Sequence, residues 1–137
     1  MNASRRVLVA EDNRVNQRVA AGLIEKLGYE VDVVVDGHEV IEAVRNGEYG
    51  LILMDCEMPG MNGFEATRRL RMQASIAADL PIIALTAHAM EGDEERCLAA
   101  GMNAYLSKPL TLLALKAALD EIVAQKTAHP TNDRAAS

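Results

Sequence analysis

Short runs of β-branched and aliphatic residues alternate along this chain with longer segments in which apolar residues recur at helical spacing. Three of the short runs are almost continuously apolar, which is typical of parallel strands that are covered on both faces. The segments expected to form strands are residues 6–10 (RVLVA), 30–35 (EVDVVV), 51–54 (LILM), 81–85 (PIIAL) and 104–106 (AYL).

Helices are expected between and after these strands. In residues 13–27 apolar positions recur every fourth residue, and Gly28 follows as a C-terminal stop. Further helical patterns cover residues 39–46, 64–72 and 92–100, and a last one follows Pro109, with Leu112, Leu115, Leu119 and Ile122 along one face. This order predicts an α/β fold, in which right-handed crossovers place helices on both faces of a parallel sheet.

The composition narrows the class of protein. A length of 137 residues suits one domain, which we expect over 1–125, with the polar segment 126–137 as a disordered tail or linker. A net charge of −6 argues against nucleic acid or an anionic membrane as the partner. There is no secretory signal pattern and no apolar run of membrane-spanning length, and two cysteines with no metal-ligand spacing suit reduced thiols, so a cytoplasmic location is expected.

Polar residues follow several of the predicted strands. The carboxyl ends of parallel strands share one edge of the sheet, where ligands bind in open α/β folds. Three carboxylates, two hydroxyls and one ammonium group should therefore converge there. They are Glu11 and Asp12 after the first strand, Asp55 after the third, Thr86 after the fourth, and Ser107 and Lys108 after the fifth.

These acidic residues have two interpretations. Asp12 alone could equally be the N-cap of the following helix. Three carboxylates held together, however, repel one another and need a compensating charge, which a divalent metal, Lys108 or both could supply. Carboxylate oxygens without His or Cys suit Mg²⁺ or Mn²⁺. A free carboxylate beside such a metal can act as the nucleophile in phosphoryl transfer.

Four stretches resemble the receiver domains of two-component response regulators. They are VLVAEDN at 7–13, LILMDCEMPGMNGFE at 51–65, PIIALTA at 81–87 and AYLSKPL at 104–110. The resemblance covers about residues 6–123. It implies a flavodoxin-like (βα)5 three-layer sandwich with a parallel five-stranded sheet of order 2-1-3-4-5.

The resemblance also implies roles for the acidic residues. Asp55 would be the phosphoacceptor, receiving a phosphoryl group from the phosphohistidine of a histidine kinase or histidine phosphotransfer domain. Mg²⁺, with Mn²⁺ as a possible substitute, would be held by Asp12 directly, by Glu11 largely through water, and by Asp55 and the backbone carbonyl of Glu57.

Further roles follow from the same resemblance. Lys108, joined to Pro109 by a cis peptide bond, would contact the phosphoryl group. Thr86 would be drawn toward that group and Tyr105 would turn in behind it. This movement would repack the face formed by the fourth helix, the fifth strand and the fifth helix, where an output partner could bind.

Two residues are candidates for tuning the lifetime of the phosphoryl group. Glu57 and His88 lie two residues after Asp55 and Thr86, where side chains flank the attacking water in similar receivers. For His88 an exposed loop residue is the simpler interpretation. Cys56 is expected to point to the opposite face of the strand from Asp55 and to pack under a helix.

The stretches EDNRVNQRVAAGLIEKLGY and TAHAMEGDEERCLAAGMNAYLSKPL are more similar to receivers attached to hybrid histidine kinases than to receivers with DNA-binding outputs. In such a relay the first helix and the loops around the site would dock the phosphodonor. The domain is expected to be a switch that catalyses only its own phosphorylation and dephosphorylation. If it is excised from a hybrid kinase, the parent protein would be a histidine kinase. The alternatives are a receiver-like interaction module that is never phosphorylated and a small phosphatase with an Asp nucleophile.

Overall fold

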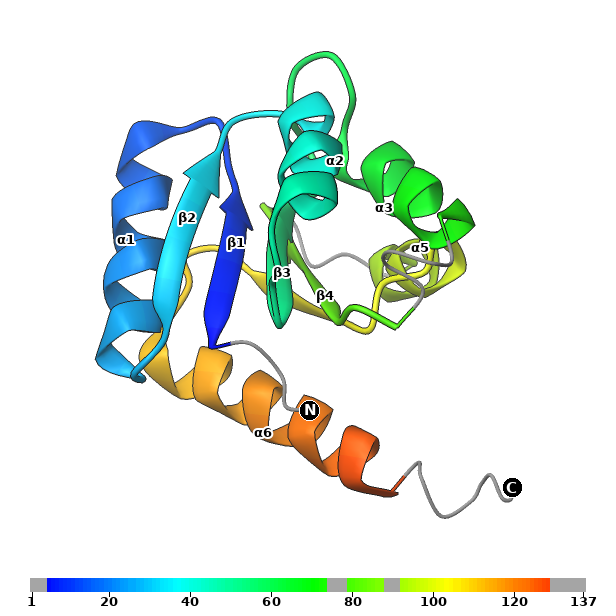
Figure 1. Cartoon of the computed structure of the whole chain (residues 1–137). Coiled ribbons are helices and arrows are strands. Elements are labelled where there is room, and N and C mark those ends of the chain that lie inside the picture. The colour runs from blue at the N-terminus through cyan, green and yellow to red at the C-terminus, as the bar shows by residue number, and fades with distance from the viewer. Residues whose placement is uncertain (1–4, 74–78, 88–91, 129–137) are drawn as a thin grey trace.

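A computed structural model describes residues 5–73, 79–87 and 92–128, and side chains as far as residue 122. The described residues form one parallel sheet of five strands in the order β2-β1-β3-β4-β5 (Figure 1). The strands are β1 (Arg6–Ala10), β2 (Glu30–Val34), β3 (Leu51–Asp55), β4 (Ile82–Thr86) and β5 (Ala104–Ser107). This is the predicted flavodoxin-like order.

Helices cover both faces of the sheet, which makes three layers (Figure 1). The residues buried between helices and sheet fall into two clusters, one on each face. Helices α1 (Arg14–Lys26) and α6 (Leu112–Ala128) close one cluster, and α2 (Gly37–Asn46), α3 (Gly63–Met72) and α5 (Asp93–Ala100) close the other. Alternate residues of each central strand point into opposite clusters, which is why those strands are apolar throughout.

The element boundaries agree with the sequence prediction to within one or two residues at most ends. Two features of the helical faces differ. The buried residues of α1 are Ala20 and Ile24, whereas Val15 and Val19 are 68% and 42% exposed, so the every-fourth-residue pattern does not mark the buried face. Leu112 is also exposed, because it is the first residue of α6 and precedes the buried positions that begin at Leu115.

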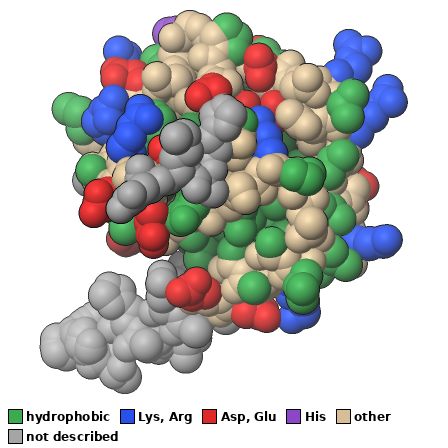
Figure 2. Space-filling view, turned by 180° about the vertical axis from the view of Figure 1, so that it is seen from behind, with side chains coloured by type: hydrophobic (Ala, Val, Ile, Leu, Met, Phe, Trp, Pro, Cys, Tyr) green, Lys and Arg blue, Asp and Glu red, His purple; other side chains and the backbone are tan. Residues whose placement is uncertain are grey.

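Helix α6 continues to Ala128, so the predicted domain boundary after Gln125 falls within its last turn. Residues 129–137, which make up most of the predicted tail, lie outside the described part of the chain. On the face seen in Figure 2, Lys and Arg side chains occur at scattered points, and hydrophobic side chains occupy much of the centre. Within the described residues, every helix is too short or too polar to cross a membrane.

Candidate functional site

Asp55 is the last residue of β3, and the residue is 3% exposed. Its Oδ1 accepts a hydrogen bond from the backbone N–H of Glu57 at 3.0 Å, and its Oδ2 lies 3.2 Å from Nζ of Lys108. The carboxylate is therefore held from two sides at the end of a central strand. Burial raises the pKa of Asp55 to about 6, and the negative charge of Glu11 adds to that effect, while the contacts with Glu57 and Lys108 oppose it.

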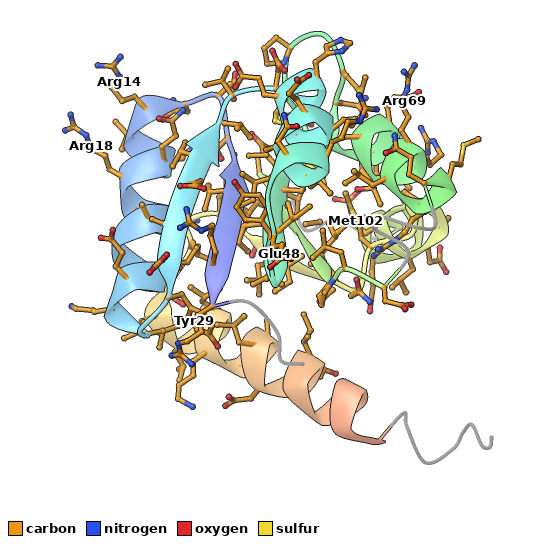
Figure 3. All side chains as sticks on the ribbon, in the orientation of Figure 1. Arg14, Arg18, Tyr29, Glu48, Arg69 and Met102 are labelled. Atoms are coloured by element: carbon orange, nitrogen blue, oxygen red, sulfur yellow. The ribbon has the colours of Figure 1, made fainter. Side chains whose placement is uncertain are left out.

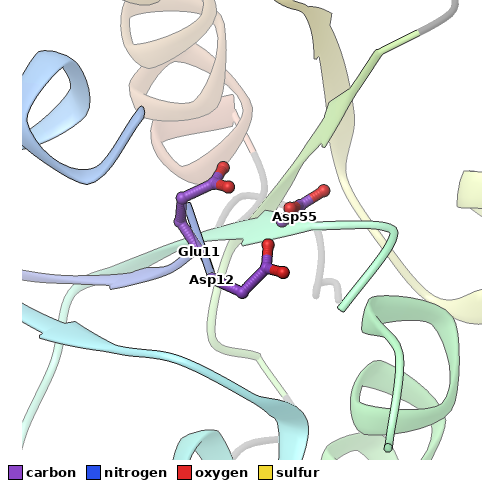
Figure 4. Close-up of side chains that lie close together, drawn as sticks. All are labelled: Glu11, Asp12 and Asp55. Carbon is purple, nitrogen blue, oxygen red and sulfur yellow. The ribbon is translucent and has the colours of Figure 1, made fainter. Parts of the chain in front are cut away.

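Glu11 and Asp12 follow β1 directly and complete an acidic cluster with Asp55 (Figure 4). One carboxylate oxygen from each of the three residues lies within 4.8 Å of the others. Glu11 is fully buried, whereas Asp12 is exposed. The predicted convergence of the three acids at the carboxyl edge of the sheet is confirmed.

The N-cap interpretation of Asp12 is wrong. The residue that caps α1 is Asn13, whose side chain accepts a hydrogen bond from the N–H of Asn16 at 3.0 Å. Since Asn13 satisfies the helix terminus, the carboxylate of Asp12 is available to the cluster.

Polar residues at the start of α1 hold Glu11, and the sequence analysis missed this role. The Oε2 of Glu11 accepts hydrogen bonds from the Asn13 N–H at 3.2 Å and from Asn16 Nδ2 at 3.4 Å. Nε2 of Gln17 donates to the Glu11 carbonyl at 2.7 Å. The signal was present in the sequence as two side-chain amides, Asn16 and Gln17, five and six residues after Glu11.

Lys108 follows β5 and brings the cation that the acids require. Its Nζ lies 3.0 Å from Oε1 of Glu11, in addition to its contact with Asp55. Its backbone N–H donates to the carbonyl of Thr86 at 2.8 Å, and the Lys108–Pro109 bond is cis, as expected. Burial opposes the charge of this ammonium group, but the contacts with Glu11 and Asp55 outweigh it and raise the pKa of Lys108 above its ordinary value.

The cluster fits a divalent cation with a preference for oxygen. The donor set consists of carboxylate oxygens, with no His or Cys among the three clustered residues. The buried Oε1 of Glu11 has the ammonium group of Lys108 as its neighbour at 3.0 Å, and the same ammonium group serves Asp55. One ammonium group beside three carboxylates also leaves negative charge to be neutralised.

Thr86 and Tyr105 lie on neighbouring strands. Thr86 ends β4 and is buried, and the register of β4 with β5 pairs it with Ser107 and pairs Ala84 with Tyr105. Because side chains alternate along a strand, Thr86 and Tyr105 project from the same face of the sheet. Tyr105 packs partly buried against the cluster that α2, α3 and α5 close.

Three further residues named in the sequence analysis contribute no side chain to the acidic cluster in the described part of the chain. The Glu57 side chain is exposed, and its N–H is the group that binds Asp55. Cys56 is buried in the cluster on the α2, α3 and α5 face, as predicted, and burial raises the pKa of its thiol to about 12, which makes it a packing residue. His88 lies outside the described residues.

Known proteins share this fold and sequence pattern. The sequence model of the response regulator receiver domain family matches residues 7–120. Histidine kinase 1 of Arabidopsis thaliana is 41% identical over 140 residues, covering 77% of this chain and 12% of that protein. Sensor protein EvgS of Escherichia coli K12 is 41% identical over 116 residues, covering 85% of this chain and 9% of that protein. The chain thus spans about a tenth of the length of these relatives.

Solved structures agree. The receiver domain of the sensor histidine kinase PA1611 from Pseudomonas aeruginosa PAO1, crystallised with a magnesium ion in its active-site cleft, superposes with a TM-score of 0.80 at 43% identity, covering 89% of this chain and 99% of that one. A chain of the co-crystal of the Saccharomyces cerevisiae histidine phosphotransfer protein Ypd1 and the receiver domain of Ssk1 has a TM-score of 0.79 at 28% identity, covering 92% and 93%.

A parallel sheet of this order with an acidic cluster at its carboxyl edge defines a flavodoxin-like α/β domain whose candidate site lies where such folds bind ligands. The chain belongs to the response regulator receiver domain family and is a receiver domain of two-component phosphorelay signalling.

Proposed function

We propose that Asp55 is the phosphoacceptor of this receiver. The observation that carries the proposal is a nearly buried carboxylate at the end of β3, with an ammonium nitrogen 3.2 Å away and two further carboxylates in the same cluster. Oδ2 or Oδ1 of Asp55 forms a bond to phosphorus as the P–N bond of a phosphohistidine breaks. The released imidazole nitrogen takes a proton, and the product is an aspartyl phosphate.

The residues around Asp55 would bind Mg²⁺ and the phosphoryl oxygens. Asp12 directly, Glu11 largely through water, Asp55 and the Glu57 backbone carbonyl would hold Mg²⁺, and Mn²⁺ would suit the same oxygen donors. When bound, the metal neutralises charge on the phosphoryl oxygens. Lys108 would hold one of those oxygens beside Asp55, as an ammonium group that its contacts with Glu11 and Asp55 keep protonated.

The switch proposed here uses Thr86 and Tyr105. The Thr86 hydroxyl binds a phosphoryl oxygen, and Tyr105 turns toward the space that Thr86 leaves, on the same face of the sheet. The face that this changes is formed by α5, β5 and α6, where a hollow of about 210 Å³ is lined by Leu98 and Tyr105 among others. We assign the output partner to this face. Phosphorylation then shifts a population between two states.

The phosphodonor is a histidine kinase or a histidine phosphotransfer domain, and we propose that it docks on α1 and the loops beside the site. Val15 and Val19 of α1 are exposed, and Arg14 and Arg18 project from the outer side of the helix (Figure 3). Exposed apolar side chains on the helix that follows Glu11 and Asp12 favour a protein partner over a small ester. Glu57 and His88 are proposed to tune the lifetime of the aspartyl phosphate.

This chain acts as a switch and turns over only its own phosphoryl group. We place it in the cytoplasm. The similarity to sensor kinases favours an origin in a hybrid histidine kinase, of which the chain would be the receiver.

The decisive experiment is the intact mass of the protein after incubation with acetyl phosphate, with and without Mg²⁺. We expect a Mg²⁺-dependent gain of one phosphoryl group that is lost in Asp55→Asn, because the amide is not a nucleophile. Labelling that persists in Asp55→Asn would contradict the assignment of Asp55. The absence of labelling from both acetyl phosphate and a phosphohistidine protein would favour the interaction module, whereas many turnovers on a small phosphate ester would favour the phosphatase.

A further inference from the structure

The loop of residues 56–62, called the site loop below, runs from Asp55 to α3 and is anchored at both ends by helix N-termini. At its start, the N–H of Gly63 donates to the carbonyl of Cys56 at 3.1 Å. At its far end, the N–H of Gly37 donates to the carbonyl of Met61 at 3.2 Å. Gly37 is the first residue of α2, a helix from which no residue of the acidic cluster comes.

There is no room for a side chain at position 37. A Cβ atom on Gly37 would lie 2.6 Å from the carbonyl oxygen of Met61 and 2.8 Å from both Cβ and Cγ of the same residue. Such distances force a displacement, because carbonyl oxygen and Cβ are fixed to the backbone of the loop. Gly37 is not among the glycines with a positive φ, so it is required here for space and not for backbone conformation.

The side chains of the site loop cannot relieve this contact by rotating into solvent. Met58 and Met61 are both buried in the cluster between the sheet and helices α2, α3 and α5. The N-terminus of α2 is itself held, since Asp36 caps the N–H of Glu39 at 2.9 Å and the Glu39 carboxylate accepts from Val35 N–H at 2.8 Å. Because Val40 and Val44 also bury α2 against the sheet, a side chain at position 37 would push on the loop at Met61.

We propose that Gly37 is a positioning residue for the metal site, acting through Met61 on the site loop. The inference rests on the proposed function, in which the Glu57 carbonyl is a ligand of Mg²⁺. Glu57 lies four residues before Met61, and its own N–H is bound by Asp55. In a short loop tied at both ends, displacing Met61 away from α2 changes the orientation of the Glu57 peptide and misplaces its carbonyl.

The test is the affinity for Mg²⁺ of Gly37→Ala, measured by isothermal titration calorimetry. We expect the dissociation constant to rise about tenfold, the low end of what outer-shell changes cost a metal site. Labelling by acetyl phosphate should recover at saturating Mg²⁺, since Asp55 and Lys108 are untouched. The matched control is Gly47→Ala at the other end of α2, whose Cβ would meet the Tyr49 ring at 3.2 Å and should leave Mg²⁺ affinity unchanged.

Urea unfolding of each variant measures its free energy of unfolding, so that an effect on Mg²⁺ affinity can be distinguished from a loss of folded protein. A folded Gly37→Ala with unchanged Mg²⁺ affinity overturns the inference. If that variant does not fold, Met61→Ala decides, because it removes the buried side chain that holds the loop against α2 and should also weaken Mg²⁺ binding; unchanged affinity there overturns the inference. If the unaltered chain binds no Mg²⁺, the proposed function itself fails.

Discussion

The ammonium nitrogen of Lys108 lies 3.0 Å from Oε1 of Glu11, a carboxylate with no exposed surface. This pair joins the ends of β5 and β1, which are separated by two other strands in the sheet. Because the same nitrogen also contacts Asp55, one cation compensates part of the charge of the acidic cluster. A metal ion that enters the cluster meets the repulsion of this ammonium group.

Lys108→Met should therefore bind Mg²⁺ more tightly and accept phosphoryl groups poorly. Two unit charges 4 Å apart interact by about 4 kcal/mol at an effective dielectric of 20, so removal of the cation should tighten binding by at least roughly tenfold. Labelling by acetyl phosphate should fall because a phosphoryl oxygen loses its partner. Calorimetry and intact mass measure the two effects. Lys116→Met, which removes an exposed lysine paired with Asp120, is the control; equal effects in both variants would refute the prediction.

The pKa of Asp55 predicts how the metal-free protein responds to pH. Burial raises this pKa from 3.8 to about 6 in the folded state, so the folded chain holds more protons than the unfolded chain between these values. Stability contributed by this group is thus lost as the pH rises from about 4 to about 6. Asp55→Asn should be more stable than the unaltered protein at pH 7.5, by at most about 3 kcal/mol since one pKa unit is worth about 1.4 kcal/mol.

Urea unfolding without divalent metal at pH 4 and pH 7.5 measures this difference. The advantage of Asp55→Asn should shrink toward pH 4, because there the carboxyl group is protonated in the folded chain and only partly ionised in the unfolded chain. An advantage of the same size at both pH values would mean that burial of the ionised Asp55 carboxylate does not destabilise the folded state.

Asp12→Ala should weaken Mg²⁺ binding and leave the fold intact, because the Asp12 side chain is exposed and Asn13 caps the helix. Loss of one carboxylate ligand should cost at least roughly tenfold in affinity. Calorimetric titration measures it. Asp120→Ala removes the same charge from an exposed position on α6 and is the matched control; an equal loss in both variants would show that only net charge matters.

Arg71→Met should destabilise the fold without changing the site. The guanidinium of Arg71 donates to the carbonyls of Gly101 at 2.9 Å and Leu80 at 2.7 Å, and to Oδ1 of Asn103 at 2.9 Å. It ties α3 to two loops at the amino ends of β4 and β5, whereas the acidic cluster lies at the carboxyl ends.

Three hydrogen bonds from a charged, half-buried group suggest a loss of about 2–4 kcal/mol on urea unfolding. The control is Arg69→Met, which removes an exposed partner of Glu65 and should cost less than about 1 kcal/mol. Mg²⁺ affinity should be unchanged in both variants. A weaker Mg²⁺ affinity in Arg71→Met alone would mean that the two ends of the sheet are coupled.

Much of this protein follows from local pattern. Continuous apolar runs such as 51–54 can be buried on both faces only between helices. The acids at the carboxyl ends of β1 and β3 must meet because parallel strands end at one edge. The apolar pattern predicted the helix α1 but not its buried face, because Val15 and Val19 keep helical spacing and are nevertheless exposed to solvent. Periodicity identifies a helix, but which face is buried depends on where the sheet lies.

The sequence by itself determined the α/β order, the family resemblance and the set of acids that share an edge. Only the tertiary structure decided that Asn13 and not Asp12 caps α1, that Lys108 pairs with Glu11 as well as Asp55, and that Gly37 touches Met61. Each of these depends on distances between elements that are far apart in the chain. Sequence spacing sets such distances only within a single helix, strand or turn, and packing sets them everywhere else.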